Sequence, residues 1–111
     1  MPFGRFILEE RKKAGLSQKD LAALIRKEDG SAISPQYLND IEHDRRGPPP
    51  DYIIDQLADA LNVPREYLYY LAGQLPADLR ERDQSTEPEK VQEAFRAFRR
   101  ALGSNDNAVD T

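Results

Sequence analysis

At 111 residues, of which 39% are hydrophobic, the chain can bury one compact core and carry an appended segment, but it is too short for several large domains. It contains no cysteine and one histidine, which excludes disulfides and thiolate metal sites and leaves Cys/His nucleophilic catalysis without its usual groups. The net charge of −4 is unevenly spread: residues 1–27 hold seven Lys and Arg against three Asp and Glu, whereas residues 48–111 hold seven against twelve, so the total does not exclude nucleic-acid binding.

Two helices are predicted at the start of the chain. The first covers Phe3 to Ala14, with Phe6 and Ile7 facing inward. The second begins after Ser17, whose hydroxyl can accept a hydrogen bond from a free backbone N–H at the helix start. Leu21, Leu24 and Ile25 then form an apolar stripe on this second helix.

A third helix is predicted over residues 34–43. Ser34 is a suitable N-cap, and Pro35 occupies the first helical position, where the missing N–H of proline is not needed. Helical spacing turns one set of side chains at least partly inward: Tyr37, Leu38 and Ile41. It leaves a polar set on the other faces: Gln36, Asn39, Asp40 and His43.

The segment 27–33, between the second and third helices, is longer than the three or four residues usual in a helix-turn-helix. Gly30 allows a positive φ within it. We favour a surface loop extension that leaves the helix crossing intact. The alternative is a protruding loop that contacts phosphate or a partner protein, and the acidic pair Glu28 and Asp29 argues against phosphate.

Two further helices are predicted, one over residues 51–61 with Asp51 as its cap and one over residues 65–72 closed by Gly73. The second of these carries three tyrosines: Tyr67, Tyr69 and Tyr70. Two of them can be buried, but a helix this short cannot hide all three. The exposed ring either forms an aromatic subunit contact or belongs to an ordinary amphipathic surface.

The organisation changes after Gly73. A short helix is expected over residues 75–82 and a polar connector over 83–86. Thr86 and Glu89 have the spacing of a capping box, which predicts a last helix over residues 87–102. Its apolar edge consists of Val91, Phe95, Phe98 and Leu102. This edge must pack on its own domain or on the same helix of a second chain, and we favour the second chain.

The residues from Phe3 to Gly73 resemble the lambda-repressor and Cro type of helix-turn-helix regulators, the XRE family. The resemblance is carried by the segments 11–18, 21–22, 33–42, 45–49, 57–63 and 67–68. In sequence these read RKKAGLSQ, LA, ISPQYLNDIE, RRGPP, LADALNV and YL. Five consecutive helices in the family's order make this more specific than a lone helix-turn-helix pattern.

The resemblance implies that the third helix enters the major groove of DNA as a recognition helix. Its expected base contacts come from Gln36, Asn39, Asp40 and Pro35, although proline stands where some relatives carry a base-reading polar residue. Asp40 can accept from a cytosine amino group or simply repel phosphate. The expected phosphate contacts come from Gln18, Lys19, Ser34, Arg45 and Arg46.

Arg11 occupies the place from which, in the family, a helix 1 arginine pairs with the glutamate that ends the recognition helix, here Glu42. We interpret the pair as an orienting salt bridge. The alternative is two solvated charges that contribute little.

The sequence therefore predicts an all-α protein with a five-helix lambda-repressor-like domain (1–73), a helical extension for dimerisation or partner binding (74–102) and a flexible tail (103–111). We expect a cytoplasmic, sequence-specific transcriptional regulator, preferably a repressor, that binds double-stranded DNA as a homodimer on an inverted repeat. The alternative is a protein-interaction module or antitoxin-like partner that acts through the last helix. We expect no enzymatic activity, cofactor or metal, and no membrane insertion or secretion, since there is no apolar run of 18 residues and no leader.

Overall fold

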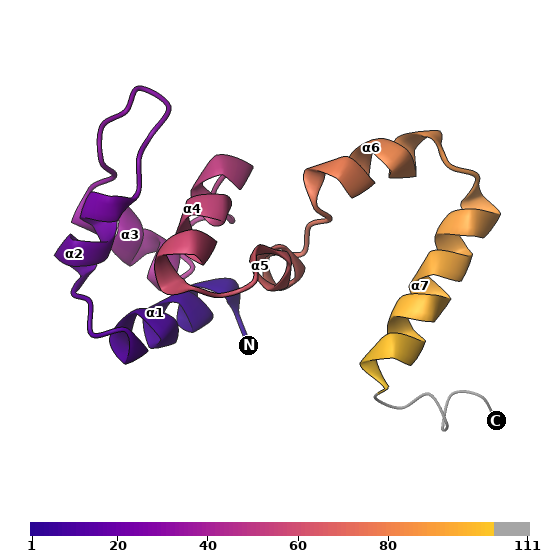
Figure 1. Cartoon of the computed structure of the whole chain (residues 1–111), viewed down its shortest axis with the longest axis horizontal. Coiled ribbons are helices and arrows are strands. Elements are labelled where there is room, and N and C mark those ends of the chain that lie inside the picture. The colour runs from indigo at the N-terminus through magenta and orange to yellow at the C-terminus, as the bar shows by residue number, and fades with distance from the viewer. Residues whose placement is uncertain (104–111) are drawn as a thin grey trace. The chain divides into compact units, whose positions relative to one another are not determined.

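The computed structural model describes the backbone of residues 1–103 and, apart from 82–85, their side chains. Within these residues the protein is helical and contains no strand beyond one isolated bridge (Figure 1). The helices are α1 (Phe3–Lys13), α2 (Gln18–Leu24), α3 (Pro35–Glu42), α4 (Asp51–Leu61), α5 (Arg65–Ala72), α6 (Ala77–Ser85) and α7 (Pro88–Leu102). The chain divides into two compact units, one over Met1–Pro76 and one from Ala77 onward.

The first unit is built around one apolar core to which α1 to α5 all contribute. α1 packs on α3, α4 and α5, while α2 packs on α3 and α4 packs on α5. The largest fully buried side chains are Ile7, Leu21, Ile25, Leu38, Ile53, Ile54, Leu57 and Leu68. Burial of a side chain of this kind contributes about 1.5–3 kcal/mol, so these residues fix the arrangement of the five helices.

The start of α2 follows from a capping box. The Ser17 hydroxyl accepts from the Asp20 backbone N–H at 3.0 Å, and the Asp20 carboxylate accepts from the Ser17 N–H at 3.2 Å. Of the expected apolar stripe, Leu21 and Ile25 are buried, whereas Leu24 is 55% exposed. α2 ends at Leu24, and Ile25 in extended conformation fills the core in its place.

The segment between α2 and α3 forms a small hairpin that extends away from the helices (Figure 1). Arg26 pairs with Ala32 in an antiparallel bridge, and the Ile33 N–H donates to the Ile25 carbonyl at 2.9 Å. Gln56 of α4 holds the first arm at its base through two hydrogen bonds to Arg26. Its Oε1 accepts from the Arg26 N–H at 2.7 Å, and its Nε2 donates to the Arg26 carbonyl at 2.9 Å. The extra residues therefore close on themselves at a fixed position.

α1 and α3 approach each other closely at Gly4. A Cβ atom on Gly4 would overlap the Ile41 carbonyl oxygen and lie 2.8 Å from the Glu42 carbonyl oxygen. The Gly4 N–H donates to Asp44 Oδ1 at 3.0 Å, so a residue just beyond α3 caps the start of α1. Asp44 itself has a φ of 54°, in the left-handed region. This crossing sets the distance between the two helices.

α4 and α5 pack on each other and on α1. Asp51 is the first residue of α4 and does not cap it, because Pro50 is the N-cap and no side-chain hydrogen bond caps this helix end. Gly73 closes α5 in left-handed conformation. Only one of the three α5 tyrosines is buried: Tyr69 donates to Asp55 Oδ1 at 2.8 Å, and burial and this acceptor raise its pKa to about 12.

The second unit contains α6 and α7. α6 reaches Ser85, so it covers most of the segment expected as a polar connector. The expected capping box at Thr86 is wrong, because Glu87 is the N-cap of α7 and makes no side-chain cap hydrogen bond. Along the apolar edge of α7, Val91 is half-buried and the other three side chains are exposed, as follows: Phe95 45%, Phe98 46% and Leu102 54%. Of the predicted tail, residues 104–111 lie outside the described residues.

We expect Gly4→Ala to lower the free energy of unfolding by about 1–3 kcal/mol, because the added methyl group must push α1 away from α3. Gly47→Ala is the control, since nothing lies within 4 Å of the position of its Cβ. Urea unfolding followed by circular dichroism measures both variants. Equal stability of the two would contradict the close approach at Gly4.

Candidate nucleic-acid interface

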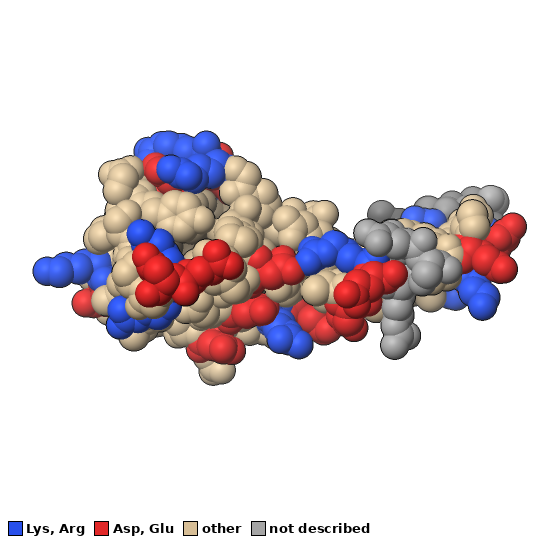
Figure 2. Space-filling view, turned by 90° about the horizontal axis from the view of Figure 1, so that it is seen from above, with Lys and Arg blue, Asp and Glu red and all other residues tan. Residues whose placement is uncertain are grey.

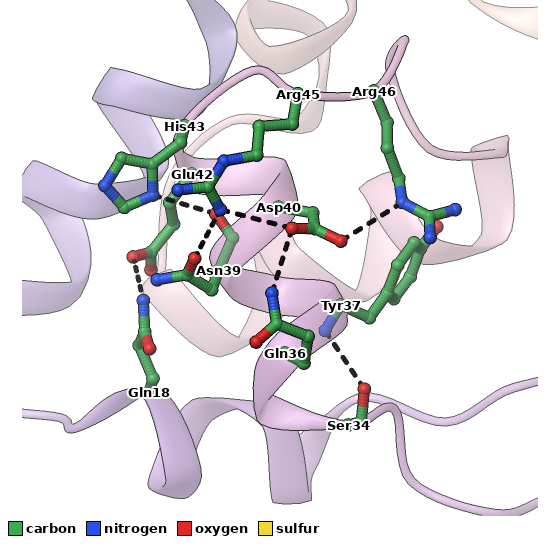
Figure 3. A network of polar contacts seen from close by, with 10 residues as sticks. All are labelled: Gln18, Ser34, Gln36, Tyr37, Asn39, Asp40, Glu42, His43, Arg45 and Arg46. Atoms are coloured by element: carbon green, nitrogen blue, oxygen red, sulfur yellow. Dashed lines mark hydrogen bonds and ion pairs between the residues drawn. The ribbon is translucent and has the colours of Figure 1, made fainter.

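α3 presents a polar edge to the outside of the first unit. Ser34 caps the helix, its hydroxyl accepting from the Tyr37 N–H at 3.0 Å, and Pro35 stands at the first helical position. Leu38 and Ile41 are buried, and Tyr37 is half-buried, which fixes the rotation of the helix. Three of the predicted base-contacting side chains consequently lie together on the outward edge, namely Gln36, Asn39 and Asp40 (Figure 3). The fourth, Pro35, is the first residue of the helix.

Asp40 is the acceptor at the centre of this edge (Figure 3). Its Oδ1 accepts from Gln36 Nε2 at 3.0 Å and from Arg45 Nη1 at 3.2 Å, and its Oδ2 lies 3.4 Å from Arg46 Nε. Desolvation raises the pKa of Asp40, but the hydrogen bonds from Gln36, Arg45 and Arg46 outweigh this effect and hold the pKa below its ordinary value. The carboxylate is therefore charged near neutral pH and is bound to the chain's own cations.

The two loop arginines make further contacts with α3. Arg45 Nη1 donates to Asn39 Oδ1 at 2.6 Å. The guanidinium carbon of Arg46 lies 5.2 Å from the centroid of the Tyr37 ring, in a cation–π contact. Both arginines are therefore placed beside the polar edge even though they follow α3 in the chain.

The chemistry of these partners fixes how the two amides are turned. A carboxylate only accepts, so Gln36 directs its NH₂ group to Asp40 and keeps its Oε1 available as an acceptor. A guanidinium only donates, so Asn39 directs its Oδ1 to Arg45 and keeps its NH₂ available as a donor. Each NH₂ has two hydrogens, so Gln36 also retains one donor. The edge thus presents a defined set of donors and acceptors.

Arg11 and Glu42 form a buried ion pair behind this edge. Arg11 Nε donates to Glu42 Oε2 at 2.6 Å, and Nη2 donates to Oε1 at 3.1 Å, so the pair is bidentate. Arg11 Nη1 also donates to the Leu16 carbonyl at 2.9 Å. The side chains of Arg11 and Glu42 are 10% and 0% exposed, so the solvated alternative does not describe this pair. It links α1, the loop before α2 and the end of α3.

The residues expected to contact phosphate lie around the edge. Gln18, at the first position of α2, donates from Nε2 to Glu42 Oε1 at 2.8 Å, which joins the start of α2 to the same ion pair. Lys19 is exposed one position further on, and the exposed Ser34 hydroxyl keeps its own hydrogen to donate. On the face drawn in Figure 2, basic side chains gather at one edge of the N-terminal unit with small acidic areas beside them.

A family model described as helix-turn-helix matches residues 7–68, more than half of the chain. The chain belongs to this family, in its XRE branch. It is thus a DNA-binding regulator with a lambda-repressor-like helix-turn-helix domain, in which α2 and α3 are the helix-turn-helix pair. The fold is similar to a solved structure described as a SinR protein/SinI protein complex, with a TM-score of 0.53, 19% identity, and coverage of 92% of this chain and 99% of that chain. No curated protein sequence matches the chain.

Two features of this helix-turn-helix domain were not predicted from the sequence. The Gln36–Asp40 pair has the i,i+4 spacing at which a glutamine and an aspartate bond on a helix, so that signal was present. The contacts of Arg45 and Arg46 with α3 depend on the path of the loop, which no local pattern gives. Among residues 1–103, no helix is long and apolar enough to cross a membrane.

We expect Arg11→Met to lower the free energy of unfolding by about 3–5 kcal/mol, because it leaves the Glu42 carboxylate buried without its cation. Arg5→Met is the matched control: it removes an arginine from the same helix, but the Arg5–Glu9 pair is exposed and contributes about 0–1 kcal/mol. Urea unfolding measures both. A loss for Arg11→Met no greater than that for the control would show that the pair does not brace the domain.

Proposed function

We propose that the protein is a sequence-specific transcriptional repressor that inserts α3 into the major groove of double-stranded DNA. One observation carries this proposal: the only buried ion pair among the described residues holds the end of α3, while uncharged amides and two arginines stand on its outward edge. A rigid helix with a polar edge and flanking cations is what groove reading requires. Occupation of the groove also excludes other proteins from the same duplex, which favours repression.

Gln36 and Asn39 are the proposed base-reading residues. Gln36 retains an acceptor and one donor, the pair that recognises the N6 and N7 atoms of adenine. Asn39 retains its NH₂ donors, which suit the acceptors of adenine, guanine or thymine in the major groove. Each such contact contributes about 1–3 kcal/mol of discrimination.

Phosphate contacts are assigned to the cations and capping groups around the edge: Gln18, Lys19, Ser34, Arg45 and Arg46. Contacts of this kind fix the position and register of the protein without choosing a sequence. They also make the affinity depend steeply on salt.

A dimer on an inverted repeat is the proposed assembly, because a single α3 offers only a few base contacts. The two half-site centres then lie about 34 Å apart, one turn of the duplex. The apolar edge of α7 is the proposed contact between the two chains, since none of the residues of this 15-residue helix is buried. An exposed apolar edge on an amphipathic helix is stabilised by pairing.

The second candidate function is a protein-interaction module that acts through α7. It is favoured by the same exposed edge and by the solved structure of similar fold, which is described as a complex of two proteins. A random-sequence duplex at low salt separates the two functions. Measurable binding supports the regulator, whereas absence of binding together with a stable hetero-complex would support the module.

We expect Gln36→Ala to lose preference for the selected sequence while Arg46→Ala weakens binding to every duplex and lowers the salt slope by about 1. Arg65→Ala, an exposed arginine of α5, is the control for loss of positive charge. The probes are a duplex selected from a random pool and single-base variants of it, measured by fluorescence anisotropy at two salt concentrations. Equal loss on all duplexes for Gln36→Ala would remove it from base reading.

We expect Phe95→Glu in the full chain to raise the dimer dissociation constant at least about tenfold, because it buries a charge in the proposed contact. Ala97→Glu adds the same charge to α7 away from the apolar edge and is the matched control. Sedimentation velocity over a concentration series gives both constants. An unchanged constant for Phe95→Glu would place the subunit contact elsewhere.

A further inference from the structure

The charges on the α3 edge partly cancel within the chain. Two arginines face the DNA-binding side, yet both are paired to Asp40, the same carboxylate that also holds Gln36. We propose that Asp40 is a specificity-determining residue. Its carboxylate pairs with Arg45 and Arg46 in the unbound protein, and DNA phosphates replace it as the partner of these two arginines on binding. The inference rests on the proposed function, because it concerns how that interface discriminates between DNA sequences.

The geometry allows this exchange without movement of α3. The side chain of Asp40 is 18% exposed, whereas those of Arg45 and Arg46 are 54% and 59% exposed. The arginines therefore lie outside the carboxylate, on flexible stems, and follow the end of the helix. They can turn to phosphate oxygens while Asp40 remains on its rigid turn of α3.

The exchange has a cost that is the same for every DNA sequence. A guanidinium that is already bound to a carboxylate must leave it before it can bind phosphate. Ion pairs of this exposure contribute little to stability, so the cost of breaking each one is modest, but it is incurred twice. While either pair persists, one fewer phosphate is neutralised, and both the affinity for random DNA and its salt slope are reduced.

The gain after the exchange depends on the sequence. Once the arginines have moved, Asp40 faces the groove as a charged group that can only accept hydrogen bonds. Guanine N7 and O6, thymine O4 and adenine N7 are also acceptors and repel it, whereas the amino groups of cytosine and adenine can donate to it. The exchange is therefore most favourable where such an amino group lies opposite Asp40. On other sequences the exchange is less complete, so binding is weaker.

Asp40→Asn in the 111-residue chain tests this inference, because asparagine keeps the shape of the side chain and removes its charge. We expect its affinity for a pool of random duplexes to rise about three- to tenfold, with a salt slope steeper by about 1–2 as the two arginines are released. Its preference for the duplex selected by the unaltered protein, measured as the affinity ratio over the pool, should fall about tenfold.

Asp59→Asn is the matched control, since it removes one exposed carboxylate from α4 by the same substitution. If both substitutions change affinity and slope alike, only net charge matters and the inference fails. If Asp40→Asn leaves the pool affinity, slope and selectivity unchanged while the unaltered protein binds its selected duplex, the inference fails and the proposed function stands. If the unaltered protein binds no duplex, the proposed function fails and the inference fails with it.

Discussion

The buried pair between Arg11 and Glu42 is the interaction on which the position of the polar α3 edge depends. It holds the last turn of α3 against α1, and through Leu16 and Gln18 it reaches the loop before α2 and the first position of α2. A buried pair of charges requires well-aligned donors and acceptors, and among the described residues no buried side-chain nitrogen or oxygen lacks a partner. Buried contacts thus hold α3 in place, so the polar groups on its outward edge are not needed to position the helix.

A second level of organisation lies on the surface. The polar groups of the α3 edge are hydrogen-bonded to one another. Asp40 orients the Gln36 amide and Arg45 orients the Asn39 amide in the unbound protein. Pre-arranged amides lose less conformational freedom on binding than mobile ones. The same network also binds Arg45 and Arg46. It therefore orients the amides and at the same time limits the contacts that these two cations make with other groups.

Much of the fold could be predicted from local signals. Ser17 and Ser34 as caps, Pro35 at a helix start and Gly73 at a helix end all match the structure, because capping depends on neighbouring atoms. The predicted cap at Thr86 is wrong, since helix ends shift by a residue or two without changing the pattern. The arginine contacts of Asp40, like the long-range bonds of Gln56 and Asp44, depend on tertiary placement, so spacing along the chain could not give them.

Because the hairpin between α2 and α3 is closed at its base, the angle between the two helices does not depend on the length of the connection. Its two arms are hydrogen-bonded to each other, and Arg26 in the first arm is hydrogen-bonded to Gln56 of α4, so Ile33 lies beside Ile25 where the hairpin closes. The hairpin extends away from the helices (Figure 1), and nothing lies within 4 Å of the position that a Cβ on Gly30 would take. The length and composition of the tip can therefore vary at small structural cost. A domain of this kind can gain new surface there while α2 and α3 keep their positions.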